Sequence, residues 1–213
     1  MKRITFWLDF ISPYAYLAFE KLPEALKGLS YRVDYRPVLF AGLLKHHGQL
    51  GPAEIPPKRD WTYRQVLWLA HAHGIPMELP AGHPFNPLGA LRLALACGQG
   101  GLVNRQVAET VFRHIWRGGG DAADAQRLAV LATDLQPARD PNGSAVKAEL
   151  KANTDAAIGQ GLFGVPTCEV DGKLFWGFDG LPMLRAWCEG DLWFASGAWE
   201  RAAALPVAKA RAS

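Results

Sequence analysis

Both faces of a short segment near the start of the chain are apolar, which predicts a buried strand. The segment is residues 3–10, RITFWLDF, in which apolar side chains occupy both sides of an extended chain. Apolar residues at helical spacing follow in residues 14–27, where Pro23 is expected to kink or end the helix. Residues 31–38, YRVDYRPV, predict a second strand. The chain therefore begins with a short strand-helix-strand unit.

The middle of the chain has a helical period. Helices are predicted at residues 39–48, 61–74, 88–98, 102–117, 121–134 and 144–159. Two proline-rich segments, residues 51–60 and 74–87, are predicted loops at the two ends of one helix, an arrangement that indicates a cleft. Because this block is too long for a loop, we expect an inserted helical subdomain.

Extended segments return late in the chain. Residues 166–177, PTCEVDGKLFWG, predict a hairpin with the two-residue turn Asp171-Gly172. Residues 181–190 predict a closing helix, and the Ala-rich tail after Leu205 is expected to fray. The order of elements predicts an α/β fold with a helical insertion before the hairpin.

Composition and charge narrow the class of protein. The 213 residues fit one domain, or one domain with a large insertion, and 49% of them are hydrophobic, enough for a core. The formal charge of +3 is small and the basic residues are scattered, so no nucleic-acid partner is expected. No apolar run reaches the roughly 18 residues of a membrane span. Asp9 interrupts the apolar start too early for a signal peptide, so we expect a soluble cytoplasmic protein.

The cysteines and histidines do not indicate a metal site or a disulfide framework. Cys97, Cys168 and Cys188 are odd in number, widely spaced and without a CxxC pair. We expect all three to be small buried hydrophobic residues. The six histidines lack the spacing of metal ligands, so no metal is expected.

A tetrapeptide after the first strand differs from a dithiol redox motif at two positions. Ser12-Pro13-Tyr14-Ala15 would become Cys-Pro-Tyr-Cys if its first and last residues were cysteines. Ser12 is expected at a helix N-terminus, which favours an anion, but no base lies nearby in sequence to activate its hydroxyl. Its better chemical use is to donate a hydrogen bond to a thiolate supplied by another molecule. Considered alone, Ser12 is better explained as a simple N-cap.

A second motif favours the interpretation of Ser12 as a thiolate donor over that of a simple N-cap. Residues 164–167, GVPT, come directly before the predicted hairpin and after a glycine-rich bend. The Val165–Pro166 bond at this turn is a candidate for a cis peptide, which would leave the Val165 backbone free to pair with an extended peptide. The alternative is an ordinary trans proline at the start of a strand.

Three motifs together resemble a known family. SPYAY, FGVPT and WGFDGLPML are similar to the DsbA-type thioredoxin fold with a helical insertion, over about residues 3–190. More narrowly, the serine motif resembles the kappa-class glutathione transferases and the 2-hydroxychromene-2-carboxylate isomerases. The resemblance implies a homodimer whose chain has a thioredoxin-like domain of residues 1–38 and 158–205, a helical insertion of residues 39–157, and a tail of residues 206–213.

The resemblance implies glutathione as the cofactor. Ser12 would donate to the glutathione sulfur, and the Val165 backbone before the structurally important Pro166 would pair with the cysteinyl segment. The γ-glutamyl end would be held by Trp176, Gly177, Phe178 and Asp179. Asp179 would take the ammonium group, whereas Phe178 stands where a small polar residue is usual. The alternative for Asp179 is the N-cap of the last helix.

The same resemblance implies contacts with a small aromatic substrate. Lys45 and His83 match substrate-contacting positions of the isomerases, although a solvated helix face explains Lys45 equally well. Glu54 and Ile55 stand where Asn-Arg is expected, and Leu67 stands where an aspartate is expected. These differences fall in the substrate cleft and leave the scaffold intact.

The implied activity is glutathione-dependent isomerisation in the degradation of naphthalene-type aromatic compounds. The substrate would be 2-hydroxychromene-2-carboxylate and the product trans-o-hydroxybenzylidenepyruvate. A kappa-like glutathione transferase or a glutathione-dependent reductase would share the glutathione residues and differ in the cleft. A disulfide oxidoreductase is poorly supported because Ser12 and Ala15 cannot form a disulfide. A non-catalytic binding domain would have no affinity for glutathione.

Overall fold

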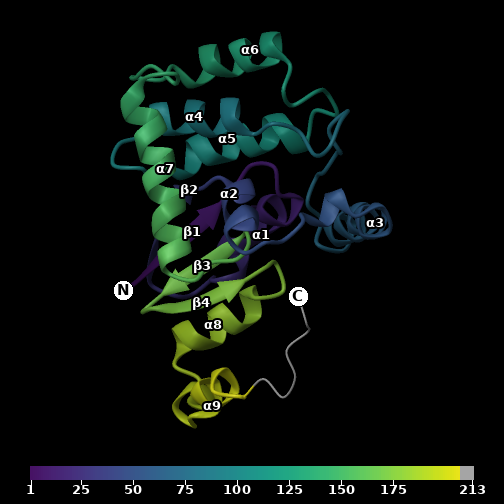
Figure 1. Ribbon diagram of the computed structural model, residues 1–213. Coiled ribbons are helices and arrows are strands. Elements are labelled where there is room, and N and C mark those ends of the chain that lie inside the picture. The colour runs from purple at the N-terminus through teal and green to yellow at the C-terminus, as the bar shows by residue number, and fades with distance from the viewer. Residues whose placement is uncertain (207–213) are drawn as a thin grey trace.

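A four-stranded sheet in the order β2-β1-β3-β4 lies in the middle of the molecule, with helices above and below it in the view of Figure 1. The computed structural model describes residues 1–206. The strands are β1 (Lys2–Leu8), β2 (Tyr31–Pro37), β3 (Thr167–Val170) and β4 (Lys173–Trp176). β2 is parallel to β1, while β3 pairs antiparallel with both β1 and β4. Both early strands and the hairpin were predicted from the sequence and are confirmed; all but the first residue of the predicted tail, 206–213, lies outside the described residues.

Strand β1 is buried on both faces, as its apolar pattern predicts. Ile4, Phe6 and Leu8 belong to the main core, which also contains most of the buried side chains of the helical block. Trp7 points to the opposite face and packs in a smaller cluster that includes Val165. The sheet therefore separates two apolar layers, and the smaller one lies directly behind the segment that precedes β3.

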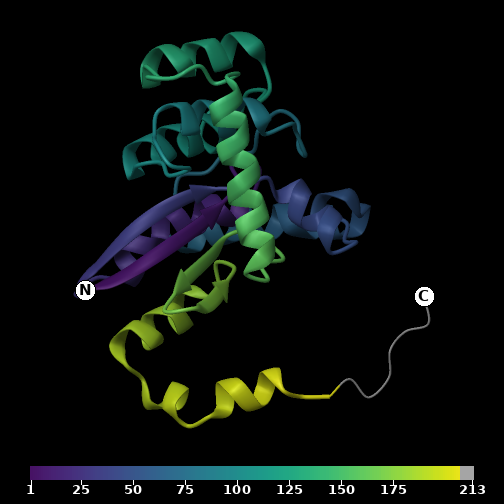
Figure 2. The same cartoon turned by 60° about the vertical axis from the view of Figure 1, so that its left-hand side comes forward.

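Helices occupy most of the chain between β2 and β3. They are α2 (Phe40–His46), the 3₁₀ turn η1 (Pro52–Glu54), α3 (Pro56–Ala72), α4 (Leu88–Ala96), α5 (Arg105–Trp116), α6 (Ala125–Leu135) and α7 (Ser144–Gly159). α4, α5 and α6 lie above the sheet, and α3 lies to one side (Figure 1). Figure 2 shows α7 running from this helical layer down to the sheet. None of the helices in residues 1–206 is long and apolar enough to cross a membrane.

Two expectations about proline are corrected by the structure. Residues 51–60 were expected to be a loop, but η1 forms there and α3 begins at Pro56. Proline is tolerated in the first helical turn, where the backbone N–H groups have no intrahelical partner. Helix α1 (Pro13–Ala25) continues two residues past Pro23, so that proline lies in its last turn. By contrast, residues 74–87 form a loop, as predicted.

The C-terminal part adds helices at the end of the molecule opposite α6 (Figure 1), and the buried side chains of the first of them join the main core. The predicted closing helix is α8 (Leu181–Glu189), but η2 (Leu192–Ala195) and α9 (Ala198–Ala203) were not predicted. Figure 2 shows this segment extending below the hairpin. Aromatic rings hold it there, since Phe194 lies 6.2 Å from Phe175 and 5.1 Å from Trp187 between ring centroids.

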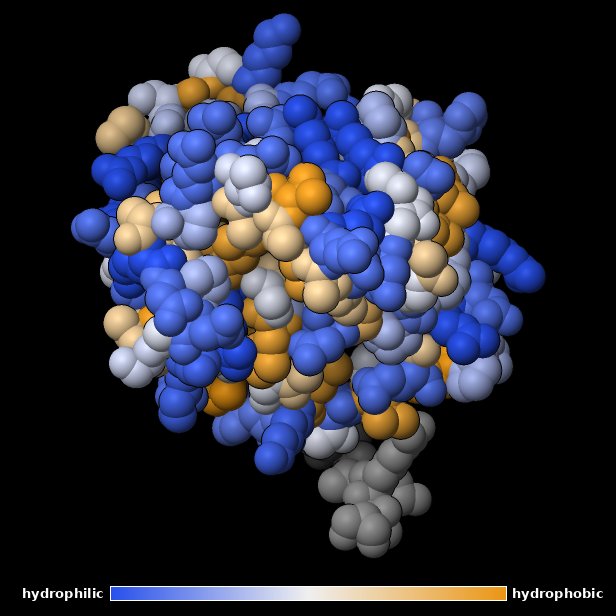
Figure 3. Space-filling model, turned by 90° about the horizontal axis from the view of Figure 1, so that it is seen from above, coloured by the Kyte–Doolittle hydropathy of each residue, from blue (hydrophilic) through white to orange (hydrophobic). Residues whose placement is uncertain are grey.

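The end of the molecule formed by the helical layer is mostly hydrophilic. In the view from above, apolar side chains gather in a narrow band across the middle of a polar face (Figure 3). Scattered or narrow apolar areas of this kind are ordinary on a protein surface. This end of the molecule therefore shows no broad apolar surface, and the predicted functional residue Ser12 lies elsewhere, directly after β1.

Asn153 connects α7 to β2 and to the loop after α4. Its side chain is 3% exposed. The amide nitrogen donates to the Pro37 carbonyl at 2.9 Å and to the Gly101 carbonyl at 2.7 Å. The amide oxygen accepts from Arg36 at 3.2 Å. One buried side chain therefore satisfies three polar groups from two segments.

We predict that Asn153→Ala lowers the free energy of unfolding by roughly 2–4 kcal/mol, because two buried carbonyls lose their donor. Urea denaturation monitored by circular dichroism measures this change. Asn142→Ala, at an exposed position before α7, is the control and should change stability by less than about 0.5 kcal/mol. Equal stability of the two variants would contradict the role assigned to Asn153.

Candidate functional site

The Ser12 side chain lies where β1 gives way to α1. Ser12 is the N-cap of α1, and its Oγ accepts a hydrogen bond from the Ala15 amide at 3.2 Å. Pro13 occupies the start of the helix, as predicted. The N–H groups and dipole of a helix N-terminus stabilise a nearby anion. The N-cap role is confirmed, and it leaves the hydroxyl proton available to another acceptor.

That proton is donated to the Val165 carbonyl. The Ser12 Oγ lies 3.2 Å from this oxygen, although 153 residues separate the two positions in sequence. The Val165–Pro166 peptide is cis, which confirms the prediction. The distance exceeds the usual value of about 2.7–2.8 Å for a hydroxyl donor, so the bond is weak enough for a ligand to replace. The structure thus brings together the two residues predicted to hold a thiol.

A buried carboxyl group lies within the Ser12 loop. Asp9 is 0% exposed, and its carboxylate accepts the Ile11 amide at 3.1 Å and the Phe40 amide at 2.8 Å. Its backbone carbonyl accepts the Ser12 amide at 3.1 Å. Burial raises the pKa of Asp9 to about 7, although backbone hydrogen bonds oppose the rise. Asp9 therefore joins the loop to the start of α2 and changes charge near neutral pH.

His83 packs behind the same loop. Its Nε2 lies 2.8 Å from the Ile11 carbonyl, and its Nδ1 lies 2.9 Å from the Tyr63 hydroxyl. Nε2–H must be the donor to the carbonyl, so Nδ1 carries no proton, and Nδ1 shares the single Tyr63 hydroxyl proton with the His83 carbonyl oxygen, which lies 2.8 Å from that hydroxyl. Burial lowers the pKa of His83, so the ring is neutral at neutral pH. A hollow of about 320 Å³ opens beside it, lined by Arg59, Tyr63 and residues 79–83.

The aromatic residues of the WGFD stretch contact different parts of the molecule. Trp176 is 53% exposed, and its ring centroid lies 4.9 Å from that of Phe163. Phe178 packs instead against His73 at the end of α3, with centroids 5.0 Å apart. The four residues predicted to hold a γ-glutamyl group therefore do not share one set of neighbours.

Gly177 and Asp179 form the turn between β4 and α8. Gly177 has a φ of +88°, and a Cβ there would lie 2.4 Å from the Asp179 carboxylate, so the turn requires glycine. Burial is the main cause of the raised pKa of the Tyr14 phenol, and the charge of Asp179 raises it further. The N-cap of α8 is Gly180, which has no side-chain cap. The alternative interpretation of Asp179 as that N-cap is therefore wrong.

Lys45 is exposed in the last turn of α2. The nearby His47 contacts the Leu162 carbonyl through Nε2 at 3.0 Å, which ties the end of α2 to the segment before Val165. Leu43 of the same helix packs with Val165 in the smaller apolar cluster. The helix that carries Lys45 is thus fixed relative to Val165, while the substrate role of Lys45 stays a prediction.

The positions that depart from the isomerase pattern lie around the start of α3. Glu54 accepts the Gly51 amide at 2.5 Å and so caps its own short turn. Ile55 and Leu67 are both exposed. Apolar side chains at these two positions offer a ligand no hydrogen bond, which distinguishes this cleft from the pattern expected from the sequence.

Several residues of the site were not predicted. Tyr14 donates from its hydroxyl to Gln65 Oε1 at 2.6 Å, which joins α1 to α3. Asp9 could have been predicted as a site residue, because a carboxylate within an apolar strand-like run is unusual. Tyr63 and Gln65 could not, since polar residues in the middle of a helix are ordinary.

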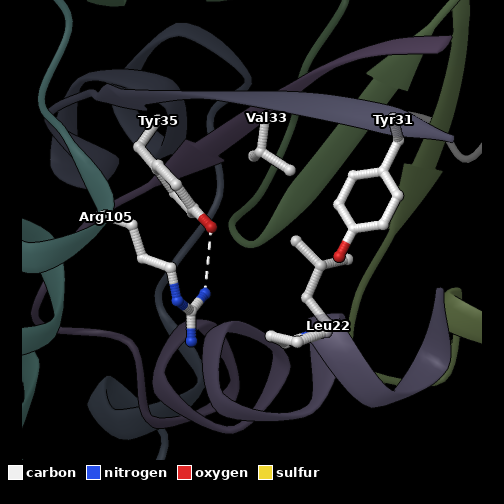
Figure 4. A pocket seen from close by; sticks show the side chains of 6 residues that line it. Leu22, Tyr31, Val33, Tyr35 and Arg105 are labelled. Atoms are coloured by element: carbon white, nitrogen blue, oxygen red, sulfur yellow. Dashed lines mark hydrogen bonds between the residues drawn. The ribbon is translucent and has the colours of Figure 1, made fainter. Parts of the chain in front are cut away.

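A second hollow lies away from Ser12, at the opposite end of α1 (Figure 4). It measures about 310 Å³ and is lined by Leu22, Pro23, Tyr31, Val33, Tyr35 and Arg105. Arg105 donates to the Tyr35 hydroxyl at 3.0 Å, as the dashed line in Figure 4 marks. The ten helical residues from Pro13 to Leu22 span about 14 Å, so this hollow is separate from the site at Ser12.

The cysteines take no part in the site. All three are free, but only Cys168 is buried, whereas Cys97 and Cys188 are partly exposed. The expectation of three buried cysteines is therefore correct for Cys168 alone. Burial raises the pKa of all three thiols, which disfavours the reactive thiolate. In residues 1–206, no group of three or more His, Cys, Asp or Glu side chains could hold a metal ion.

Comparisons with known proteins point to one family. A family model described as a DSBA-like thioredoxin domain matches residues 3–187. The chain is 29% identical over 196 residues to a 2-hydroxychromene-2-carboxylate isomerase of Sphingobium xenophagum, covering 87% of this chain and 97% of that protein. It is 29% identical over 205 residues to a glutathione S-transferase kappa 2 of Caenorhabditis elegans, covering 86% and 90%. A solved 2-hydroxychromene-2-carboxylate isomerase superposes with a TM-score of 0.74, at 23% identity over 95% of this chain and 98% of that chain. The predicted thioredoxin-like fold is confirmed.

We predict that Asp9 makes the protein less stable as the pH rises toward 7. Its folded pKa of about 7 lies above the value of about 3.9 in an unfolded chain. The folded protein therefore holds a proton that the unfolded chain has lost, and the stabilisation is complete below about pH 4 and disappears as the pH passes 7. In urea denaturation, wild type should lose roughly 2–3 kcal/mol more than Asp9→Asn between about pH 5 and pH 8.

Asp60→Asn, on the exposed surface of α3, is the control for removing a carboxylate without changing a buried one. Parallel stability curves for wild type and Asp9→Asn would show that Asp9 does not titrate in this range.

Proposed function

Because the chain belongs to the DSBA-like thioredoxin family, we propose that it is an enzyme that uses glutathione to isomerise 2-hydroxychromene-2-carboxylate to trans-o-hydroxybenzylidenepyruvate. The observation that carries the proposal is the Ser12 hydroxyl at a helix N-terminus, 3.2 Å from the Val165 carbonyl. Ala15 occupies the second cysteine position of a dithiol motif, so the chain cannot form a disulfide there. The thiol must therefore come from a ligand.

The polar groups around Ser12 suit a cysteine-containing peptide. The Val165 carbonyl can accept the amide of an extended peptide, and this pairing would release the Ser12 proton. The Ser12 hydroxyl would then donate to the sulfur while still accepting the Ala15 amide. A hydrogen bond to a charged group contributes about 1.5–3 kcal/mol, equivalent to a decrease of roughly one to two units in the pKa of the bound thiol.

The substrate would lie between Lys45 and His83, the two residues predicted to contact it. When bound, glutathione would supply a nucleophilic sulfur that adds reversibly to a conjugated carbon and so permits rotation about a former double bond. Lys45 would pair with the substrate carboxylate. His83 would contact the aromatic part through its ring face, because both of its ring nitrogens are engaged by Ile11 and Tyr63. A homodimer in the cytoplasm is part of the same proposal.

A kappa-like glutathione transferase is the second candidate function. It is favoured by the exposed apolar side chains of Ile55 and Leu67, where the isomerase pattern calls for polar residues. The 29% identity to a glutathione S-transferase kappa 2 is consistent with this candidate. Conjugation of a model electrophile without turnover of the chromene would decide for the transferase, and no affinity for glutathione would remove both candidates.

We predict that Ser12→Ala lowers turnover of the chromene by roughly 10- to 100-fold, because it removes the donor to the sulfur. The absorbance change of the substrate in the presence of glutathione measures the rate. Asn104→Ala is the matched control: Asn104 caps α5 through the Val107 amide at 2.8 Å, far in sequence from the site. Both variants should lose about 1 kcal/mol of stability through the lost cap, but only Ser12→Ala should lose turnover. Wild-type activity of Ser12→Ala would reduce Ser12 to a helix cap.

A further inference from the structure

The hollow beside the second half of α1 has apolar walls on two sides. Tyr31, Val33 and Tyr35 occupy alternate positions of β2, so their side chains lie on the same face of the strand. Figure 4 shows the two tyrosines reaching toward α1 on either side of Val33. Leu22 and Pro23 of α1 complete the apolar lining. The volume of about 310 Å³ is at the small end of the range for ligand pockets.

Arg105, the first residue of α5, brings a positive charge to this lining. Its guanidinium carbon lies 4.3 Å from the ring centroid of Phe19, a side chain that is 0% exposed. The aromatic ring thus covers one face of the guanidinium. The N–H donors project from the edge of the group, and Tyr35 accepts from one of them at 3.0 Å. The others are available to a ligand.

The Tyr35 hydroxyl adds a second donor. Its side chain is 4% exposed, and its oxygen accepts from Arg105. Within residues 1–206 the hydroxyl proton has no acceptor, which is unusual for a buried polar group. Burial is the main cause of the raised pKa of this phenol, so the proton is retained at neutral pH. An acceptor supplied by a ligand would satisfy it.

No carboxylate of the described residues 1–206 neutralises Arg105, since it forms no ion pair there. The carboxylates of α1, β2 and α5 are paired with other cations: Glu20 with Arg113, Glu24 with Lys21, Asp34 with Arg3 and Glu109 with Arg113. The N-terminus of α5, where Arg105 stands, also favours a negative charge. The hollow therefore combines an apolar floor with an uncompensated positive end.

A planar ring that carries one carboxylate complements this arrangement. We propose that the hollow binds an aromatic monocarboxylate of about the size of benzoate. The carboxylate accepts from the Arg105 guanidinium and the Tyr35 hydroxyl, and the ring lies over Val33 beside Tyr31. The two tyrosines are about 13 Å apart along the strand, which leaves room for one ring between them. This site is separate from Ser12 and does not rest on the proposed function.

Titration of the isotope-labelled protein with benzoate, followed by nuclear magnetic resonance of the backbone amides, tests the site. Benzoate should shift the amides of β2 and of the first turn of α5 with a Kd on the order of 1 mM, as expected for so small a ligand. Benzamide has nearly the same shape without the charge, and it should bind roughly tenfold more weakly or worse. Arg105→Gln should raise the Kd for benzoate by roughly tenfold or more, because the charged donor is lost.

Arg64→Gln is the matched control, because it removes the same charge from an exposed position on α3 and should leave the Kd unchanged. Val33→Phe keeps Arg105 but fills the hollow, so it should abolish the shifts at β2. The proposal is wrong if benzoate shifts only amides near Ser12, if benzamide binds as tightly as benzoate, or if Arg105→Gln binds benzoate as wild type does. The comparison of the two ligands uses the wild-type chain alone, so it decides the question even if a variant does not fold.

Discussion

The hydrogen bond from the Ser12 hydroxyl to the Val165 carbonyl closes the site by joining segments that lie 153 residues apart. The segments meet because β1 pairs with β3, so that the end of the first strand adjoins the start of the hairpin. The helical block lies between them in sequence but not in space. Everything proposed about function depends on this meeting, since neither a serine at a helix cap nor a proline before a strand would suffice alone.

The same loop is held from other directions by groups that are buried and polar. Asp9 attaches it to the start of α2, and His83 attaches it to the proline-rich loop through the Ile11 carbonyl. These contacts fix the loop, so a ligand displaces only the weak Ser12–Val165 bond. A neutral His83 and an Asp9 that is about half protonated at pH 7 keep the local charge low. Little fixed negative charge therefore opposes a bound thiolate.

Much of the fold could be predicted from the sequence because its signals are local. The apolar faces of β1, the Ser12-Pro13 helix start and the Asp171-Gly172 turn each specify their own conformation. The start of α3 was mistaken for a loop because its prolines stand in the first helical turn, where their missing N–H costs nothing. α9 and η2 were missed because aromatic contacts with Phe175 and Trp187, which belong to other elements, hold them in place. The same distinction between local and long-range signals applies to the site. Ser12 and Val165 belong to short sequence motifs and could be predicted. Gln65 could not be predicted, because its contact with Tyr14 exists only once α1 and α3 are packed together.

The most direct test of the account is the ionisation of the glutathione thiol on the protein. Ultraviolet difference absorption of the thiolate, followed as a function of pH, gives the pKa of the bound sulfur without any substrate. The account predicts a value roughly one to two units below the about 8.5 of an ordinary cysteine thiol, because Ser12 and the α1 N-terminus both favour the anion. A bound thiol that titrates as it does in water would contradict it.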